Sequence, residues 1–467
     1  MSALPGPAPL GWIGIVRLGL VQTALGSIVV LTTSTINRVM VVELALPAML
    51  PGALVALHYA VQILRPCLGH GSDVGGRRTP WIIGGMIVLA LGGIGAACAT
   101  AVIPHSLPLG VALAVLAFLL VGIGVGASGT SLLVLLAKRT APARRPAAAT
   151  IVWMMMIVGF ILTAGIAGHL LDPFTLPRLV AVSSGVAVIA VLLAIAALWG
   201  VEGDSRTHAL PEVEAAPPAM SFRDALKEVW SETEARRFTI FVFVSMLAYS
   251  AQDLILEPFA GTVFGMTPGE STRLAGTQNG GVLLGMIAVA LLGNRIGTLR
   301  GWTSGGCIAS AVALLLLAIG GFVEHWPLQA TVFALGLANG TFAVAAIGSM
   351  MTLVGRGHES REGVRMGLWG AAQAMAFGLG GFIGTAAIDL TRSLLADPAF
   401  AYGIVFLLEA ATFVVAAWLA LWATRAAHSS LTQGAAEDPE RPSNALPNSR
   451  PDGDLPPARP ALAGASA

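Results

Sequence analysis

Long apolar runs separated by short polar connections dominate the pattern of this 467-residue chain. A helix needs about 20 mostly apolar residues to cross the hydrocarbon core of a bilayer. Runs of this kind occupy 12–34, 46–66, 81–103, 109–136, 149–171, 179–200, 238–258, 274–293, 302–322, 328–354, 366–388 and 400–424. The pattern therefore predicts an all-α integral membrane protein with twelve spanning helices, and only 11% charged residues exclude an ordinary water-soluble domain, which carries about 25%.

An internal repeat divides these spans into two related halves. Five positions recur at one constant offset of 221 residues: Asp73, Gly76, Trp81, Gly84 and Gly85 align with Asn294, Gly297, Trp302, Gly305 and Gly306. Parallel repeats of this kind are a transporter architecture. We therefore predict an N-terminal six-helix half (1–200), a cytoplasmic central loop (201–237), a C-terminal six-helix half (238–424) and a disordered cytoplasmic tail (425–467).

Basic residues predict the orientation in the membrane. Sixteen lysines and arginines lie on one set of connections and four on the other, which is the asymmetry of cytoplasmic against external loops. With an even number of spans, both termini are then expected in the cytoplasm. No basic patch indicates nucleic-acid binding.

The strongest local motif lies between the second and third spans. Gly69, Asp73, Gly76, Arg77 and Arg78 fit the pattern G-x-x-x-D-x-x-G-R-R, which resembles the loop motif of the major facilitator superfamily. The glycines permit a tight reversal, and the carboxylate can pair with an arginine or face a helix N-terminus. The motif favours a gating latch on the cytoplasmic side, with a rigid positive anchor as the alternative.

Ionisable residues within apolar segments are the main functional candidates, because each is costly in a bilayer and usually faces a partner or a cavity. Asp253 and Glu257, preceded by Gln252, share a face near the outer end of the seventh span, and Arg38 with Glu43 flank the outer end of the first helix pair. These residues are candidates for pigment binding, for proton coupling or for a periplasmic gate. The alternative is that Arg38, Glu43, Asp253 and Glu257 all lie at the membrane–water interface, in contact with water.

His58, inside the second span, is a weak candidate ligand for the magnesium of a bacteriochlorophyll, and a hydrogen bond to a neighbour is the commoner role. Glycine pairs with G-x-x-x-G spacing, such as Gly281 with Gly285, favour close helix packing. A groove that admits a flat pigment ring is the sharper alternative. No nucleophile–base set, phosphate loop or metal-ligand spacing is present in the sequence, so we expect neither an enzyme nor a metal site.

Two stretches of the sequence indicate which family the chain resembles. Thr35-Ile-Asn-Arg38-Val-Met-Val-Val-Glu43-Leu44 and Gln252-Asp253-Leu-Ile-Leu-Glu257-Pro258-Phe-Ala-Gly261-Thr-Val-Phe264 resemble the PucC family within the major facilitator superfamily. The resemblance extends from about Gly11 to Thr424, and the candidate acids and Arg38 lie within its most specific part.

The resemblance implies a non-enzymatic carrier or assembly factor that delivers bacteriochlorophyll for light-harvesting complex biogenesis. It implies a location in the inner, intracytoplasmic photosynthetic membrane. It also implies that no cofactor is bound covalently, that bacteriochlorophyll binds transiently, and that the partners are light-harvesting apoproteins or bacteriochlorophyll synthase. Two alternatives stay open. One is a proton-coupled secondary transporter of a small solute, and the other is an accessory subunit of the synthase.

Overall fold

The structure is a computed structural model that describes residues 10–62, 77–141, 144–202, 227, 230–293, 295–354 and 362–434. Gly69, Asp73 and Gly76 of the loop motif, most of the central loop, Asn294 and most of the tail lie outside the described residues. The chain divides into a compact unit, Met1–Arg425, and the remainder, Ala426–Ala467. The description below concerns the first unit.

The described residues form helices and no strand, as the apolar pattern predicts. The N-terminal half comprises α1 (Trp12–Val30), η1 (Leu31–Thr35), α2 (Ile36–Arg38), η2 (Val39–Glu43), α3 (Met49–Val61), α5 (Thr79–Val102), α6 (Leu107–Arg139), α7 (Arg145–Leu170) and α8 (Leu176–Leu198). The C-terminal half comprises α10 (Thr233–Phe264), α11 (Pro268–Leu292), α12 (Leu299–Gly320), α13 (Leu328–Val354), α14 (Glu362–Leu394) and α15 (Pro398–Gly434). Since η1, α2 and η2 continue α1, the described residues contain twelve helices.

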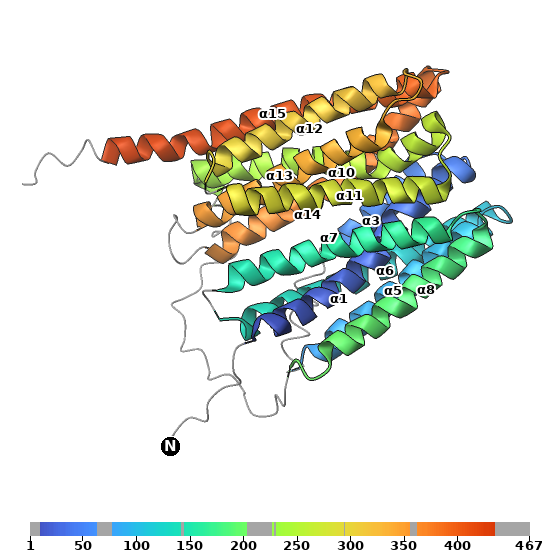
Figure 1. Cartoon of the computed structure of the whole chain (residues 1–467), viewed down its shortest axis with the longest axis horizontal. Helices are drawn as coiled ribbons and strands as arrows, with labels where there is room; N and C mark the ends of the chain where they lie inside the picture. Colours follow the sequence, from blue (N-terminus) through green and yellow to red (C-terminus); the bar gives the residue numbers. More distant parts are fainter. Residues whose placement is uncertain are drawn as a thin grey trace, which may run out of the picture. The chain divides into compact units, whose positions relative to one another are not determined.

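Eleven of these helices are long and apolar enough to cross a membrane, and α3, with 13 described residues, is the shorter one. The chain is therefore a multi-pass integral membrane protein. Figure 1 shows most of the N-terminal half, coloured blue to green, beside the C-terminal half, coloured yellow to red. Which side of the bilayer each end faces remains the prediction made from the basic residues.

Local signals in the sequence set several helix boundaries. Proline occupies the first turn of α5, α6, α7, α8 and α11, where a missing N–H costs nothing. Thr267 and Glu270 form a complete capping box at the start of α11. Gly265, with φ of +67°, ends α10 in the left-handed conformation that favours glycine.

The first helix is longer than the sequence predicted. The apolar run ends near residue 34, and Arg38 with Glu43 were expected at the connection to the second helix. Instead the helix continues to Glu43 through two π-helical turns, η1 and η2. The polar stretch stays helical because its side chains bond to α10, α11 and the connection between them, as described below.

Each half has its own core, and glycines bring the helices of each core together. A Cβ at Gly85 on α5 would lie 2.6 Å from the Ser128 backbone nitrogen on α6, and one at Gly306 on α12 would lie 2.7 Å from the Phe342 nitrogen on α13. The repeat-related residues Gly85 and Gly306 therefore allow equivalent close helix contacts in the two halves. Gly281 and Gly285 also pack against α13, which is the packing interpretation of the glycine pairs.

Candidate functional site

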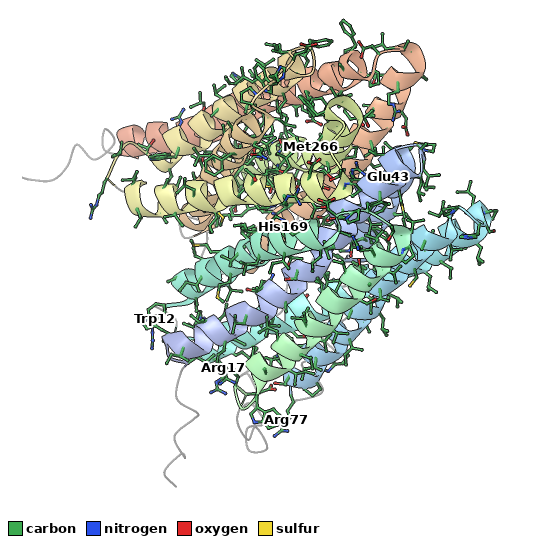
Figure 2. All side chains as sticks on the ribbon, turned by 45° about the vertical axis from the view of Figure 1, so that its right-hand side comes forward. Trp12, Arg17, Glu43, Arg77, His169 and Met266 are labelled. Carbon is green, nitrogen blue, oxygen red and sulfur yellow. The ribbon has the colours of Figure 1, made fainter. Side chains whose placement is uncertain are left out.

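The two halves meet mainly through two helix pairs, α7 with α11 and α3 with α14, and also where η1, α2 and η2 contact α10 and α11. At one end of these pairs, polar side chains from each half bond to the other half, and we call this the sealed end. Figure 2 shows Glu43 and Met266 at this end and Trp12, Arg17 and Arg77 at the opposite end. On the predicted orientation, the sealed end is periplasmic.

Asp389 of α14 caps a helix that belongs to the other half. Its Oδ1 accepts from the Ala48 backbone N–H at 2.8 Å and its Oδ2 from the Met49 N–H at 2.7 Å. The residue at the N-cap position of α3 is alanine and has no capping side chain. The N-terminus of α3 is therefore satisfied by a carboxylate from the C-terminal half, where negative charge is also favourable to the helix dipole.

Arg38 joins the same end from within the bilayer-spanning bundle. Its side chain is almost completely buried, forms an ion pair with Glu43, and donates to the Met266 carbonyl between α10 and α11. Gly261 leaves room for it, because a Cβ there would lie 2.8 Å from Arg38 Nη2. The ion pair of Arg38 with Glu43 thus lies within the N-terminal half, and the link to the C-terminal half runs through a backbone carbonyl.

A second ion pair bridges the halves nearby. Arg273 of α11 contacts Asp172, which follows α7, at 3.1 Å, and Thr267 donates to the same carboxylate at 3.0 Å. Gly168 and Gly269 allow the close approach, since a Cβ at Gly269 would lie 2.4 Å from Asp172 Oδ2. The sealed end is therefore closed by side chains of both halves.

Buried polar contacts continue inward from the sealed end. Glu257 on α10 accepts from Ser34 on η1 and, at 3.5 Å, from Ser271 on α11. Asn37 donates to the Leu254 carbonyl at 2.6 Å. The π-helical continuation of α1 thus contacts α10 and α11 with successive polar side chains, as π turns at functional sites often do.

A cavity of about 80 Å³ lies between the halves below these contacts. Its walls come from α1 and η1, α3, α7, α10, α11 and α14. Three rings line it in sequence, since Phe377 lies 5.4 Å from Tyr59 and 5.8 Å from Tyr249 between ring centroids. The rest of the lining is divided between apolar side chains and the polar groups of Thr33, Ser34, Ser250, Asp253, Gln278 and Asn279.

The structure separates the predicted candidates. Asp253 lines the cavity, and Glu257, one turn further along α10, lies in the polar contacts above it. Gln252 faces away from the cavity and is fully buried. His58 is buried, and its Nε2 lies 3.1 Å from Gln62 Nε2, so the hydrogen-bonded role that we weighed against magnesium ligation is present.

At the opposite end, Arg77 and Arg78 adjoin the start of α5. Glu202, just after α8, accepts from the backbone N–H groups of Arg78 at 2.6 Å and Thr79 at 2.8 Å. Burial raises the pKa of Glu202, but the hydrogen bonds from Thr79 and Arg78 and the charge of Arg77 lower it more, so the net pKa lies below 4.5. Glu202 thus caps the start of α5 next to Arg77 and Arg78, the described part of the loop motif, and both partners of this cap lie within the N-terminal half.

Sequence reasoning missed three acidic groups. Asp389 fell one residue beyond the predicted span 366–388, and Asp172 lies in a short connection. Glu409 lies inside the predicted span 400–424 and is buried on α15, so the rule that selected Asp253 also applies to it. The signal for Glu409 was therefore in the sequence, whereas the partners of Asp389 and Asp172 required the fold.

Comparison with known proteins decides the family. The family model described as "PUCC protein" matches residues 35–427, most of the chain. The chain belongs to the PucC family. It is 54% identical to the "Bacteriochlorophyll synthase 44.5 kDa chain" of Rhodobacter capsulatus over 88% of this chain and 95% of that protein. It is 31% identical to "Protein PucC" of the same organism over 86% of this chain and 90% of that protein.

Solved structures confirm the major-facilitator fold. A bacterial homologue of the human lysosomal transporter Spinster, inward-facing and unoccupied, matches with a TM-score of 0.66 at 15% identity, covering 88% of this chain and 96% of that one. The nucleoside transporter NupG matches with a TM-score of 0.62 at 13% identity, covering 88% and 99%. At such identities the likeness concerns the fold alone.

Proposed function

We propose that this PucC-family protein binds bacteriochlorophyll within a bacterial inner, photosynthetic membrane and delivers it for light-harvesting complex assembly. The observation that carries the proposal is the 54% identity, along nearly the whole chain, to a protein named as a bacteriochlorophyll synthase chain. The protein acts by binding and release, without covalent chemistry. Its partners are the light-harvesting apoproteins or the synthase.

The cavity supports this cargo through its chemistry. The rings of Tyr59, Phe377 and Tyr249 form one wall, and aromatic rings stack favourably on flat conjugated systems. Asn279 supplies an amide that can bond to carbonyl groups at the edge of a macrocycle. The cavity of about 80 Å³ is much smaller than a pigment, so we expect the pigment to enter only when the halves move apart.

Purification in mild detergent from a phototrophic host tests the proposal. The absorption spectrum is expected to contain a bacteriochlorophyll band, with light-harvesting or synthase polypeptides present in the same preparation. A Tyr59→Leu, Phe377→Leu double variant is expected to lose most of the band. The matched control is Phe322→Leu, Phe400→Leu, because these two rings contact each other at 4.5 Å on the exposed surface.

A gene deletion supplies the opposing outcome. If the purified protein is free of pigment and the deletion strain keeps normal antenna absorbance, the carrier proposal is wrong. If pigment is bound and only synthase polypeptides co-purify, with pigment synthesis rather than antenna assembly reduced in the deletion strain, the accessory-subunit alternative is favoured.

The second candidate function is proton-coupled transport of a small solute. Asp253 favours it, because a carboxyl group on the wall of a central cavity can exchange protons with a cargo site. Asp253→Asn is then expected to abolish pH-dependent flux in proteoliposomes. Antenna assembly that survives the same substitution would show that this carboxyl group is not needed for delivery.

A further inference from the structure

The core of the C-terminal half contains buried polar atoms that have no hydrogen-bond partner among the described residues. Glu409 on α15 is 5% exposed, and neither carboxyl oxygen is paired. Gln252 on α10 is 0% exposed, with both amide atoms unpaired. Asn339 on α13 accepts from Ser310 Oγ at 2.9 Å, but its Nδ2 is unpaired. Such groups are rare in protein interiors and call for an explanation.

Ring contacts show that these residues lie at one level of the helices. Phe342 on α13 lies 6.3 Å from Tyr249 on α10 and 5.8 Å from Phe413 on α15, between ring centroids. On each of these three helices, the polar residue lies three or four positions from the ring, towards the sealed end. This spacing is one turn on the same helix face, and it relates Gln252 to Tyr249, Asn339 to Phe342 and Glu409 to Phe413. We call Gln252, Ser310, Asn339 and Glu409 the polar layer.

A second group of rings closes the polar layer on its other side. Phe259 on α10 lies 4.9 Å from Phe406 and 5.5 Å from Tyr402, both on α15. These residues are one or two turns nearer the sealed end than Gln252 and Glu409, on the same faces. The polar layer is therefore enclosed between two aromatic layers, in a part of the bundle where an unneutralised charge is costly.

The polar layer also adjoins the cavity across α10. Asp253 lines the cavity on one side of α10, and Gln252 belongs to the polar layer on the other. A positive charge held at Glu409 would therefore lower the electrostatic cost of a charge on Asp253.

We propose that the polar layer is a binding site for one monovalent cation, a proton or a sodium ion, held by Glu409 with Gln252 and Asn339. One such charge neutralises the single carboxylate, and carboxyl and amide oxygens are the ligands that hard cations prefer. The oxygen and nitrogen of an amide can exchange places by a simple flip, so both amides can present oxygen. The site goes beyond the proposed function and does not depend on which cargo the cavity holds.

Other titratable groups on the surrounding elements bear on any test by pH. On α10, α12 and α15 they are Glu234, Arg236, Arg237, Tyr249, Asp253, Glu257, Arg300, Cys307, Tyr402, Arg425 and His428. The segment Leu328–Val354 that forms α13 contains no titratable side chain. A substitution at Glu409 itself is therefore needed to assign a response to the polar layer.

Thermal unfolding of the full-length protein in detergent, followed by tryptophan fluorescence, tests the site. Wild-type protein is compared with Glu409→Gln, which keeps the shape of a neutralised carboxyl group. One series exchanges choline chloride for sodium chloride at fixed pH and ionic strength, and the other varies pH in choline chloride. We expect the wild-type Tm to change by at least about 2 °C more than the Glu409→Gln Tm in one of the two series.

The two series distinguish the cations. A sodium response that Glu409→Gln lacks assigns a sodium ion. A pH response larger than that of Glu409→Gln, without a sodium response, assigns a proton. Gln252→Leu leaves the Glu409 carboxyl group in place and should shift the midpoint of the sodium or pH response. The same variant tests the site if Glu409→Gln does not fold. Glu324→Gln, at an exposed carboxyl group between α12 and α13, should behave as wild type. Equal responses of wild type and Glu409→Gln in both series would overturn the proposal.

Discussion

Replacing Asp389 by alanine removes the carboxylate that caps α3 from the opposite half. Loss of an N-cap costs about 0.5–2 kcal/mol. Here two backbone N–H groups lose an acceptor at 2.8 and 2.7 Å, but Asp389 is partly exposed, so we expect a cost of about 1–2 kcal/mol. The lost bonds join the two halves, and the cost therefore falls on the conformation that is closed at the sealed end.

A penalty of this size changes the ratio of open to closed conformations by about 5–30-fold. Spin labels on cysteines at positions 105 and 324, exposed connections of the two halves, report the change as a distance distribution. The labels require a background without Cys67, Cys98 and Cys307. We expect Asp389→Ala to increase the population with the longer distance, and Asp389→Asn, which keeps one acceptor, to have a smaller effect.

Asp397 offers a matched control, because it caps α15 within its own half by accepting from the Ala399 N–H at 2.8 Å. Asp397→Ala should lower the Tm without changing the distance distribution. If Asp389→Ala leaves the distribution unchanged, or if Asp397→Ala changes it equally, the cap of α3 does not stabilise the sealed end and the reasoning is refuted.

Three further perturbations follow from other contacts. Gly340→Ala would place a Cβ 2.0 Å from the Val282 carbonyl, so we expect a loss of about 1–3 kcal/mol and a lower Tm, whereas Gly280→Ala, with open space around it, should be neutral. Glu202 has a lowered pKa, so its cap of α5 stabilises the protein above about pH 4.5, and this stabilisation is lost as the pH falls further. The Tm difference between wild type and Glu202→Gln should therefore shrink on acidification, and a difference that grows would contradict this reasoning. Arg38→Lys should lower the Tm by removing one of two directed bonds, and an unchanged Tm would show that charge alone suffices at this position.

The helices could be predicted from the sequence because the bilayer imposes one requirement on every span. Each run must be long, apolar and internally hydrogen-bonded, and this requirement is visible without a partner. The repeat of Trp81, Gly84 and Gly85 at Trp302, Gly305 and Gly306 added the division into halves, since equivalent glycines must allow equivalent close contacts.

The candidate site could be predicted only in part. Asp253 was found because an acid inside an apolar run is costly wherever it points. The caps made by Asp389 could not be found, because 340 or more residues separate it from Ala48 and Met49 and nothing at either position specifies the other. The π turns of η1 and η2 were also missed, since their residues have no composition that distinguishes them from an α-helix or a connection.

Those two wide turns have a consequence for how such a site can arise and be lost. A π turn accommodates one residue more than an α turn, so each rotates everything that follows it by about 100° around the helix axis. Ser34, Asn37 and Arg38 face the C-terminal half in this rotated register. A single-residue deletion between 31 and 36 would therefore turn Asn37 and Arg38 away from their present partners together, whereas a substitution changes one contact at a time.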